Sequence, residues 1–429
     1  MNAQQAIAFI HGIERFGSKP GLRRVRLLLE KMGNPQNRLR FVHVAGTNGK
    51  GSTCAMLSHI LTEAGYQTGL YISPFVIDFC ERIQVNNRMI PHKELAEITG
   101  YVKTFWEQLN AQGETPTEFE VVVAIAMEYF ARQKCDIVVL EVGLGGRFDA
   151  TNIIEAPLVS VITSLSIDHT KYLGESIEQI AMEKSGIIKP GGVTVTSPGQ
   201  PPEALAVIME HCAQNDNPLR IPGPAEIHHA DLTGTRMEWG GQEWQIPLIG
   251  RHQAINAVTV LETCRALAER GITLNDTQIY SGILQTRFPA RMEILCRAPL
   301  VLLDGGHNLA GVRTVADALD MLEGRDIYAV CGMSADKEFD ACLSLVLPRC
   351  KRVVVTHAQS YSGAMPAPAL AQIAARYCAA VECISPPASA FAQAAAYCGK
   401  NDVLLLFGSL YLAADLRPVA LEWAAGPPK

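Results

Sequence analysis

The sequence predicts an α/β protein in which a mostly parallel sheet domain precedes a smaller C-terminal α/β domain. Short apolar runs rich in β-branched residues alternate with longer stretches of helical periodicity, which is typical of a parallel sheet covered by helices on both faces. This alternation occurs in two separate blocks of the chain. The length of 429 residues exceeds the size at which a single hydrophobic core usually keeps growing, so two domains are expected.

The predicted strands of both blocks are continuous apolar runs, as expected for strands that are buried on both faces. Those of the first block are 41–45, 68–73, 136–143 and 158–163, and those of the second block are 300–304, 327–332, 352–356 and 402–408. Each block therefore has enough strands to form a sheet of its own.

The region between the blocks, residues 198–247, is rich in proline, glycine and polar residues. Its stretch RMEWGGQEWQI predicts a hairpin that turns at Gly240 and Gly241. A later helical stretch ends at Gly271, a residue suited to a helix C-terminus. The predicted division is an N-terminal domain of residues 1–285, a linker of residues 286–296 and a C-terminal domain of residues 297–429.

Composition argues against a nucleic-acid-binding protein and against a membrane-spanning one. A formal net charge of only -6 leaves no basic excess to neutralise nucleic-acid phosphates, so a general nucleic-acid binder is not expected. The twelve cysteines are scattered without a CxxC pair, as expected for reduced thiols in a cytoplasmic protein. The richest apolar run, residues 121–127, is far shorter than the roughly 20 residues of a membrane-spanning helix.

A glycine-rich loop, GTNGKGS, joins the first predicted strand to a helical stretch. Glycines let backbone N–H groups turn around an anion, and a helix N-terminus adds positive potential. Lys50 is placed to reach the β and γ phosphates of a nucleotide, and Ser52 to face Mg²⁺. The spacing departs from GxxxxGK[ST], because a glycine separates Lys50 from Ser52. The predicted nucleotide-binding residues of the loop are Gly46, Thr47, Asn48, Gly49, Lys50, Gly51 and Ser52.

A phosphate loop does not define a reaction. The loop could be an ordinary strand-to-helix turn with a surface lysine, or it could belong to a GTPase switch, a small-molecule kinase or a ligase. Guanine-specific switches generally carry an NKxD element, which is missing from this sequence. A GTPase switch is therefore less favoured, and the remaining motifs have to decide the reaction.

Further motifs follow the loop in a fixed order: YISPF, TEFE, LEVGLGGRFDATN, SIDHTKYLG, EKSGIIK and LDGGHN. Together they closely resemble the folylpolyglutamate synthase and dihydrofolate synthase family of the Mur-ligase superfamily. The resemblance extends from GLRRVRLLLEKMGNPQ to FGSLYLAADLRP, nearly the whole chain. It implies a P-loop-type ATP-binding N-terminal domain and a Rossmann-like C-terminal glutamate-ligase domain, with ATP in the cleft between them.

The resemblance also implies a reaction. ATP phosphorylates the carboxylate of a folate or dihydropteroate, and the amino group of L-glutamate displaces phosphate to form an amide. The expected partners are these small molecules. Members of the family are commonly monomeric, so a monomer is expected. A Mur-type ligase for another carboxylate and a non-enzymatic nucleotide switch are the alternatives. Which of the two folate reactions occurs stays open.

Metal and catalytic roles come from the same resemblance. Ser52, Ser73, Glu141 and His169 match metal positions for Mg²⁺, and Lys184 matches a lysine that is carbamylated in the family. Singly, a strand-end serine, a histidine or a glutamate would more often be a cap, a hydrogen-bonded structural group or an ion-pair partner. The implied catalytic residues are Lys50, His169, Lys184, Arg291 and His307.

Three residues that follow the loop in the sequence match positions that contact ATP, namely Asn256, Arg291 and Asp304. Arg291 would offset charge on the transferring phosphoryl group, and His307 would meet the acyl phosphate or the entering amine. Activity should then require domain closure. An interdomain salt bridge is the alternative explanation for Arg291 and Asp304.

The substrate carboxylate is expected near the motifs TEFE and RFDATN, where Phe119 could stack on a pterin or aminobenzoyl ring or simply pack within its own helix. The predicted substrate-binding residues are Phe119, Glu120, Arg147, Asp149, Ala150 and Thr151. Three positions depart from the family pattern: Phe75 where SPH is common, Ala290 where PGR is common, and Gly306 where GAHN is common. The first departure removes a histidine near the expected metal.

Overall fold

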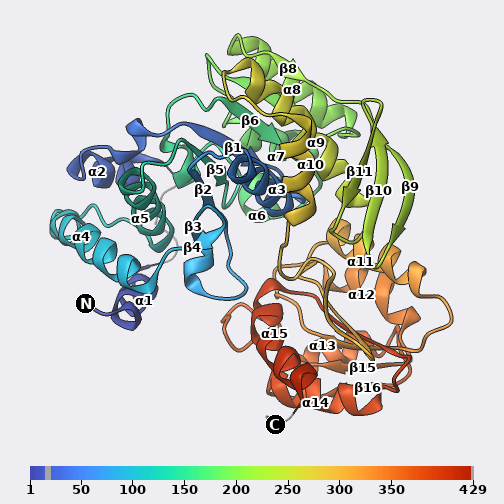
Figure 1. The fold of residues 1–429 in the computed structure, drawn as a ribbon. Coiled ribbons are helices and arrows are strands. Elements are labelled where there is room, and N and C mark those ends of the chain that lie inside the picture. Colours follow the sequence, from blue (N-terminus) through green and yellow to red (C-terminus); the bar gives the residue numbers. More distant parts are fainter. Residues whose placement is uncertain (15–20, 427–429) are drawn as a thin grey trace.

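The computed structural model describes residues 1–14 and 21–426. It contains three sheets, and Figure 1 shows the largest of them in the upper part of the molecule and the C-terminal one below it. In spatial order, the large sheet consists of β4 (Arg88–Met89), β3 (Ile83–Val85), β2 (Thr68–Tyr71), β5 (Ile137–Glu141), β1 (Phe41–Ala45), β6 (Val159–Ile162), β7 (Val193–Thr196) and β8 (Leu219–Arg220). The pairs β2–β3 and β3–β4 are antiparallel, and all other neighbours pair in parallel.

Helices cover both faces of this sheet, because successive residues of each buried strand face opposite sides. Phe41 packs toward one helical layer, whereas Val42 and Val44 pack toward the other. The layer on the Phe41 side consists of α1 (Ala3–His11), α2 (Arg23–Lys31), α4 (His92–Ala111), α5 (Glu118–Arg132), α7 (Ile177–Ser185) and α8 (Pro202–Gln214). The opposite layer consists of α3 (Lys50–Glu63), α9 (His252–Glu269) and α10 (Asp276–Gln285).

Short helical turns connect these elements, and they are η1 (Pro35–Arg38), η2 (Phe79–Arg82), η3 (Ala150–Ile153) and α6 (Thr170–Leu173). The predicted hairpin is present in a three-stranded antiparallel sheet of β11 (Gln242–Ile246), β10 (Gly234–Trp239) and β9 (Glu226–Asp231). Met237 and Trp244 bury this small sheet against the α3, α9 and α10 side of the large one.

The C-terminal sheet has six strands, of which only β12 is antiparallel to its neighbour. Their order is β12 (Glu293–Arg297), β13 (Leu300–Leu303), β17 (Val403–Phe407), β14 (Ile327–Cys331), β15 (Arg352–Val355) and β16 (Val381–Cys383). One face is covered by α11 (Leu309–Leu319), η4 (Asp320–Leu322), α12 (Phe339–Val346), η5 (Leu347–Arg349) and α13 (Ala367–Ala374), and the other by α14 (Pro387–Tyr397) and α15 (Leu410–Ala425).

The predicted fold class is confirmed, and each of the eight predicted strand segments contains a strand. The segment predicted as the linker, residues 286–296, includes the first part of β12, so the chain joins the C-terminal sheet from Glu293 onward. Within the described residues, no helix has both the length and the apolar character needed to cross a bilayer. The carboxyl ends of β1, β5 and β6 lie side by side and lead into one cleft, the position where parallel sheets bind ligands.

Candidate active site

The cleft lies between the two large sheets and has a volume of ≈ 370 Å³, which is in the usual range for a ligand site. The N-terminal domain contributes the loop after β1, the ends of β5 and β6, and the start of α9. The C-terminal domain contributes the loop after β13 and the turn before β12. The predicted residues that line it are Gly46, Thr47, Asn48, Gly49, Lys50, Gly51, Ser52, Ser73, Glu141, His169, Lys184, Asn256, Arg291, Asp304 and His307.

Two glycines of the loop are explained by their neighbours. Gly49 has a φ of +86°, and a Cβ there would lie 2.2 Å from Oδ1 of Asn256. A Cβ on Gly51 would lie 2.5 Å from the ring of Phe288. The additional glycine between Lys50 and Ser52, which departs from the usual phosphate-loop spacing, is therefore the position where the loop packs against Phe288.

Two lysines converge on the loop. Lys50 Nζ donates to the carbonyl oxygens of Gly46 at 3.1 Å and Thr47 at 3.3 Å, and Lys184 Nζ donates to the oxygen of Gly46 at 2.9 Å. Burial, with the nearby charge of Lys50, lowers the pKa of Lys184 to about 7. This corner of the cleft therefore attracts anions, and it holds one amine that loses its proton easily.

Glu141 lies at the end of β5 and is buried. Its Oε2 accepts the backbone N–H of Ser73 at 3.1 Å, and burial raises its pKa against the opposing charge of Lys50. The hydroxyls of Ser52 and Ser73 line the same cleft. Hydroxyl and carboxylate oxygens are the donors that Mg²⁺ prefers, so this set fits the predicted metal.

His169 is the N-cap residue of α6 and has a φ of +52°, a left-handed conformation that is uncommon for residues other than glycine. Burial lowers the pKa of this histidine, which favours the neutral imidazole. Its Nε2 lies 3.4 Å from Nζ of Lys337, a residue of the C-terminal domain. The predicted metal ligand therefore touches both halves of the molecule.

A polar bridge crosses the cleft beside His169. Lys337 Nζ lies 2.6 Å from Oδ1 of Asp168, and these side chains are only 7% and 8% exposed. Asn308 Nδ2 donates to Oδ2 of Asp168 at 2.7 Å and to Oδ1 of Asn48 at 3.2 Å. Although burial acts to raise it, His169 and Lys337 hold the pKa of Asp168 well below its ordinary value.

The sequence interpretation missed Asp168, Asn308 and Lys337. Asp168 and Asn308 lie inside the motifs SIDHTKYLG and LDGGHN, so their position beside His169 and His307 was a usable signal. Lys337 has no such signal, because only the folded structure brings it to Asp168, 169 positions away.

Arg291 is presented by a turn with two left-handed residues. Ala290 has a φ of +53° and Met292 a φ of +46°. The Glu293 carboxylate accepts the N–H of Ala290 at 3.0 Å, and it accepts hydrogen bonds from Nε and Nη2 of Arg417 at 2.7 to 3.1 Å. The turn is therefore held by an ion pair to α15, and the departure from PGR falls at a position whose conformation favours glycine.

Asp304 completes the support of this turn. Its Oδ2 accepts the N–H of Met292 at 2.8 Å and its Oδ1 accepts the N–H of Gly306 at 2.6 Å. Burial raises its pKa against the charge of Arg291. Next to it, His307 Nδ1 lies 2.9 Å from the oxygen of Gly305, and burial and Lys337 lower the pKa of His307 to about 4.

The predicted substrate residues lie behind the cleft rather than in its lining. Asp149 accepts N–H groups from Leu144 at 2.8 Å and Thr151 at 3.0 Å, and it accepts the Thr151 hydroxyl at 2.6 Å. Thr151 Oγ1 also lies 2.9 Å from Nε2 of buried His43. This chain of contacts shapes the loop after β5, in which Gly143 and Leu144 do line the cleft.

The other four predicted substrate-binding residues lie around the loop after β5. Phe119 lies edge-to-face with Tyr71 at 6.2 Å and against Gly143, where a Cβ would meet its ring. Glu120 accepts the N–H of Thr117 and pairs with Arg24 at 3.1 Å. Ala150 belongs to the core beside α5, and Arg147 is exposed with its guanidinium 4.9 Å from the ring of Phe148.

Residues 44–264 match the Mur ligase middle domain and residues 290–410 match the glutamate ligase domain of Mur ligases. The chain is 36% identical to the dihydrofolate synthase/folylpolyglutamate synthase of Bacillus subtilis, over 96% of this chain and 98% of that protein. It is 33% identical to the folylpolyglutamate synthase of Lacticaseibacillus casei, over 98% and 99% of the two chains.

Solved structures agree with the fold along the whole chain. Folylpolyglutamate synthase of Mycobacterium tuberculosis, complexed with ADP and AMPPCP, superposes with a TM-score of 0.88 at 29% identity and covers 98% of each chain. Escherichia coli FolC in complex with DHPP and ADP superposes with a TM-score of 0.86 at 26% identity, over 98% of this chain and 97% of that one.

Proposed function

Because the chain belongs to the folylpolyglutamate synthase and dihydrofolate synthase family of Mur ligases, we propose that it adds L-glutamate to folates, and to dihydropteroate, through an acyl phosphate. The protein is an ATP-dependent ligase that joins an amino acid to a carboxylic acid. The observation that carries the finer proposal is the cleft itself, in which the loop Gly46–Ser52 and Glu141 face Arg291 and His307.

The first step transfers a phosphoryl group. A carboxylate oxygen of the folate attacks the γ phosphorus of ATP, and the bond to the β–γ bridging oxygen breaks to release ADP. Lys50 and Arg291 place positive charge on the two sides of the transferring group, which lowers the repulsion between two anions. Asp304 and Glu293 contribute indirectly, because their carboxylates accept N–H groups of the turn that contains Arg291.

The second step forms the amide. The glutamate amine attacks the acyl carbon, and the carbon–oxygen bond to the phosphate breaks, so inorganic phosphate leaves with one oxygen of the original carboxylate. Burial and Lys337 lower the pKa of His307, so this histidine is neutral near pH 7. With Nδ1 facing the oxygen of Gly305, its Nε2 would accept a hydrogen bond from the entering amine and orient it, while the proton of the amine leaves with the phosphate.

Ser52, Ser73, Glu141 and His169 would hold Mg²⁺, which supplies charge neutralisation at the phosphates and at the acyl oxygen. Lys184 would carry a carbamate. Carbamylation requires a neutral amine, and the lowered pKa of Lys184 supports it. The adjacent Lys50 would compensate the resulting negative charge. A mass measurement of protein kept in bicarbonate, with Lys184→Met as the control, tests the modification.

The folate is expected at the loop after β5, where Gly143 and Leu144 line the cleft and Phe119 and Asp149 support them. We further propose a monomeric cytoplasmic protein whose ATP-binding domain is residues 1–285 and whose glutamate-ligase domain is residues 297–429. The interdomain bridge of Asp168 and Lys337 supports an active form in which the domains are closed.

The test is glutamate-dependent ADP formation by purified protein with ATP and Mg²⁺, with dihydropteroate and tetrahydrofolate offered in parallel. Mass spectrometry of the products identifies which acid is lengthened. With an acid labelled with ¹⁸O at the carboxylate, the label should appear in the released phosphate. No turnover with any folate or dihydropteroate would contradict the proposal and favour a Mur-type ligase for another carboxylate.

Two substitutions separate a ligase from a nucleotide switch. Lys50→Ala should abolish ATP binding under either view. His169→Ala should retain much of the ATP binding and lose ligation only if the site is catalytic. Partner binding that depends on nucleotide, without any turnover, would support the switch.

A further inference from the structure

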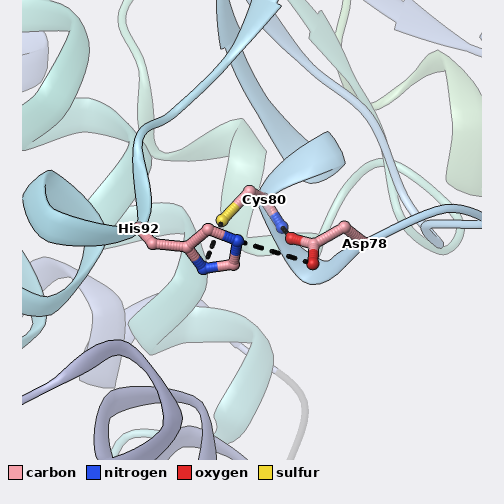
Figure 2. Close-up of side chains that lie close together, drawn as sticks. All are labelled: Asp78, Cys80 and His92. Carbon is pink, nitrogen blue, oxygen red and sulfur yellow. Dashed lines mark hydrogen bonds and ion pairs between the residues drawn. The ribbon is translucent and has the colours of Figure 1, made fainter.

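Three side chains of metal-binding chemistry gather outside the cleft, as Figure 2 shows. Asp78 caps η2, Cys80 lies within η2, and His92 is the first residue of α4. Cys80 Sγ lies 3.8 Å from His92 Nδ1, and Asp78 Oδ2 lies 3.7 Å from His92 Nε2. One donor atom from each residue lies within 4.8 Å of those of the other two.

The contact between Asp78 and His92 is loose, because a nitrogen–oxygen separation of 3.7 Å is beyond a good hydrogen bond. In a tetrahedral zinc site, bonds of about 2.0 to 2.3 Å place neighbouring ligand atoms roughly 3.3 to 3.7 Å apart. The observed separations are close to that range. The ring of His92 must turn so that one nitrogen faces both partners, and a side chain that is 60% exposed has room to do so.

The chemistry of the donors selects the metal. A thiol, an imidazole and a carboxylate form a set that favours Zn²⁺ or Co²⁺ over Mg²⁺, which prefers oxygen ligands alone. Asp78 Oδ1 is occupied by the N–H of Cys80 at 2.8 Å, which leaves Oδ2 as the free ligand atom. Since His92 and Asp78 are partly exposed, water can supply the fourth ligand.

The same three residue types could instead activate a nucleophilic cysteine. Cys80 does not fit that role, because it is only 2% exposed, and burial and the hydrogen bond with Asp78 raise the pKa of its thiol to about 12. Reactive cysteines need the opposite shift and an accessible sulfur. A bound metal displaces the thiol proton directly, so the metal is the chemistry that can use this sulfur.

We propose that Asp78, Cys80 and His92 form a Zn²⁺-type site that fastens η2 to the start of α4. The segment between Ser73 and η2 is folded by Glu81, whose carboxylate accepts the N–H groups of Val76 and Ile77 at 2.7 Å each. Val76 packs into an apolar cluster with Ala290 and Leu410 of the C-terminal half. The metal therefore steadies a segment that connects the cleft with the second domain, and it takes no part in ligation.

The test uses the full chain, stripped of metal by a chelator, and titrated with CoCl₂ in the absence of ATP. We expect about one equivalent of Co²⁺ to give a near-ultraviolet thiolate-to-cobalt absorption band, because only a coordinated thiolate produces it. Cys80→Ser should abolish the band and His92→Asn should weaken it severalfold. His228→Asn, in the exposed His228, Glu238 and Glu243 cluster, is the matched control and should leave the band unchanged.

Thermal unfolding gives a second readout. A hundredfold excess of ZnCl₂ over its Kd should raise the Tm of the wild type by roughly 5 °C, and this rise should vanish in His92→Asn, whose exposed position should not impair folding. Absence of a cobalt band in the wild type, or a band that persists in Cys80→Ser, would overturn the proposal. Either result leaves the ligase proposal untouched, since glutamate-dependent ADP formation is measured separately.

Discussion

Two turns face each other across the cleft, and they obtain their left-handed backbone in opposite ways. The loop after β1 places glycines there, with φ of +150° at Gly46 and +86° at Gly49. The turn before β12 places Ala290 and Met292 there, with φ of +53° and +46°. The first turn is permitted by its own sequence, whereas the second costs roughly 1 to 2 kcal/mol per left-handed residue.

The difference shows which residues stabilise the backbone conformation of each turn. Glycine reaches positive φ without strain, so the contacts of the phosphate loop do not have to offset a backbone cost. The turn that carries Arg291 is held by distant groups, namely the Glu293 and Arg417 ion pair and the Asp304 carboxylate. Substitutions in the first turn should act through local clashes, and substitutions in the second should act through loss of its supports.

The largest effect is expected for Gly49→Ala. The new Cβ combines left-handed strain of roughly 1 to 2 kcal/mol with a 2.2 Å approach to Asn256, which adds roughly 1 to 2 kcal/mol. We expect kcat/KM for ATP to fall by roughly a hundredfold. Gly65→Ala is the control, because its φ is +89° and a Cβ there would meet nothing within 4 Å. It should lose stability alone, and an equal loss of activity in both variants would contradict this explanation.

The second effect tests the support of the opposite turn. Glu293→Ala leaves Arg417 and the N–H of Ala290 without their partner, in a pair whose side chains are 19% exposed. We expect a loss of roughly 2 to 3 kcal/mol in the free energy of unfolding, measured by urea denaturation, and about a tenfold fall in kcat/KM because Arg291 is no longer oriented.

The matched control is Glu382→Ala on β16, at the opposite edge of the same sheet from β12. Glu382 also pairs with an arginine, Arg352, but these side chains are 29% and 39% exposed, so the cost should stay below about 1 kcal/mol. Its kcat/KM should match that of the wild type. Unchanged kcat/KM in Glu293→Ala would show that the Glu293 and Arg417 ion pair stabilises the fold without orienting Arg291.

Much of the first turn could be predicted from the sequence and little of the second. Continuous apolar runs located the strands, and the glycines, Lys50 and Ser52 located the loop, because these signals are local. Motifs indicated Arg291 and Asp304, but they did not indicate the Glu293 and Arg417 ion pair, since these two residues are 124 positions apart. The Asp168 and Lys337 bridge was missed for the same reason. The sequence also does not indicate whether a carboxylate such as Asp149 binds a ligand or accepts hydrogen bonds from its own loop, as it does here.

The third prediction concerns Lys184, a buried side chain that donates to the oxygen of Gly46 in the glycine loop. Its pKa of about 7 in the folded protein lies below the ordinary value of about 10.4 of the unfolded chain. Between these values the unfolded chain binds the additional proton, so the free energy of unfolding should rise with pH, by at most about 1.4 kcal/mol per unit.

The measurement is urea denaturation between about pH 7 and pH 9 in CO₂-free buffer, for the wild type and Lys184→Met. The rise should be steeper in the wild type than in Lys184→Met, which keeps the contribution of Lys189, whose pKa burial lowers to about 8. The difference between the two slopes should disappear below about pH 7, where Lys184 holds its proton in both states. Identical slopes in the two proteins would contradict the lowered pKa. Added bicarbonate should reduce the wild-type slope if the amine is carbamylated.

The smallest effect should come from Ala290→Gly. Relief of left-handed strain, roughly 1 to 2 kcal/mol, opposes the entropy of glycine and the loss of a buried methyl group, which together cost roughly 1.5 kcal/mol. The free energy of unfolding should therefore stay within about 0.5 kcal/mol of the wild type. Ala420→Gly is the matched control, because Ala420 is equally buried in the same apolar cluster but lies within α15. It gains no relief of strain and should lose roughly 1.5 to 2 kcal/mol. Equal losses in the two variants would mean that the turn around Arg291 stores no strain at Ala290, and the contrast between the two turns would then rest on their contacts alone.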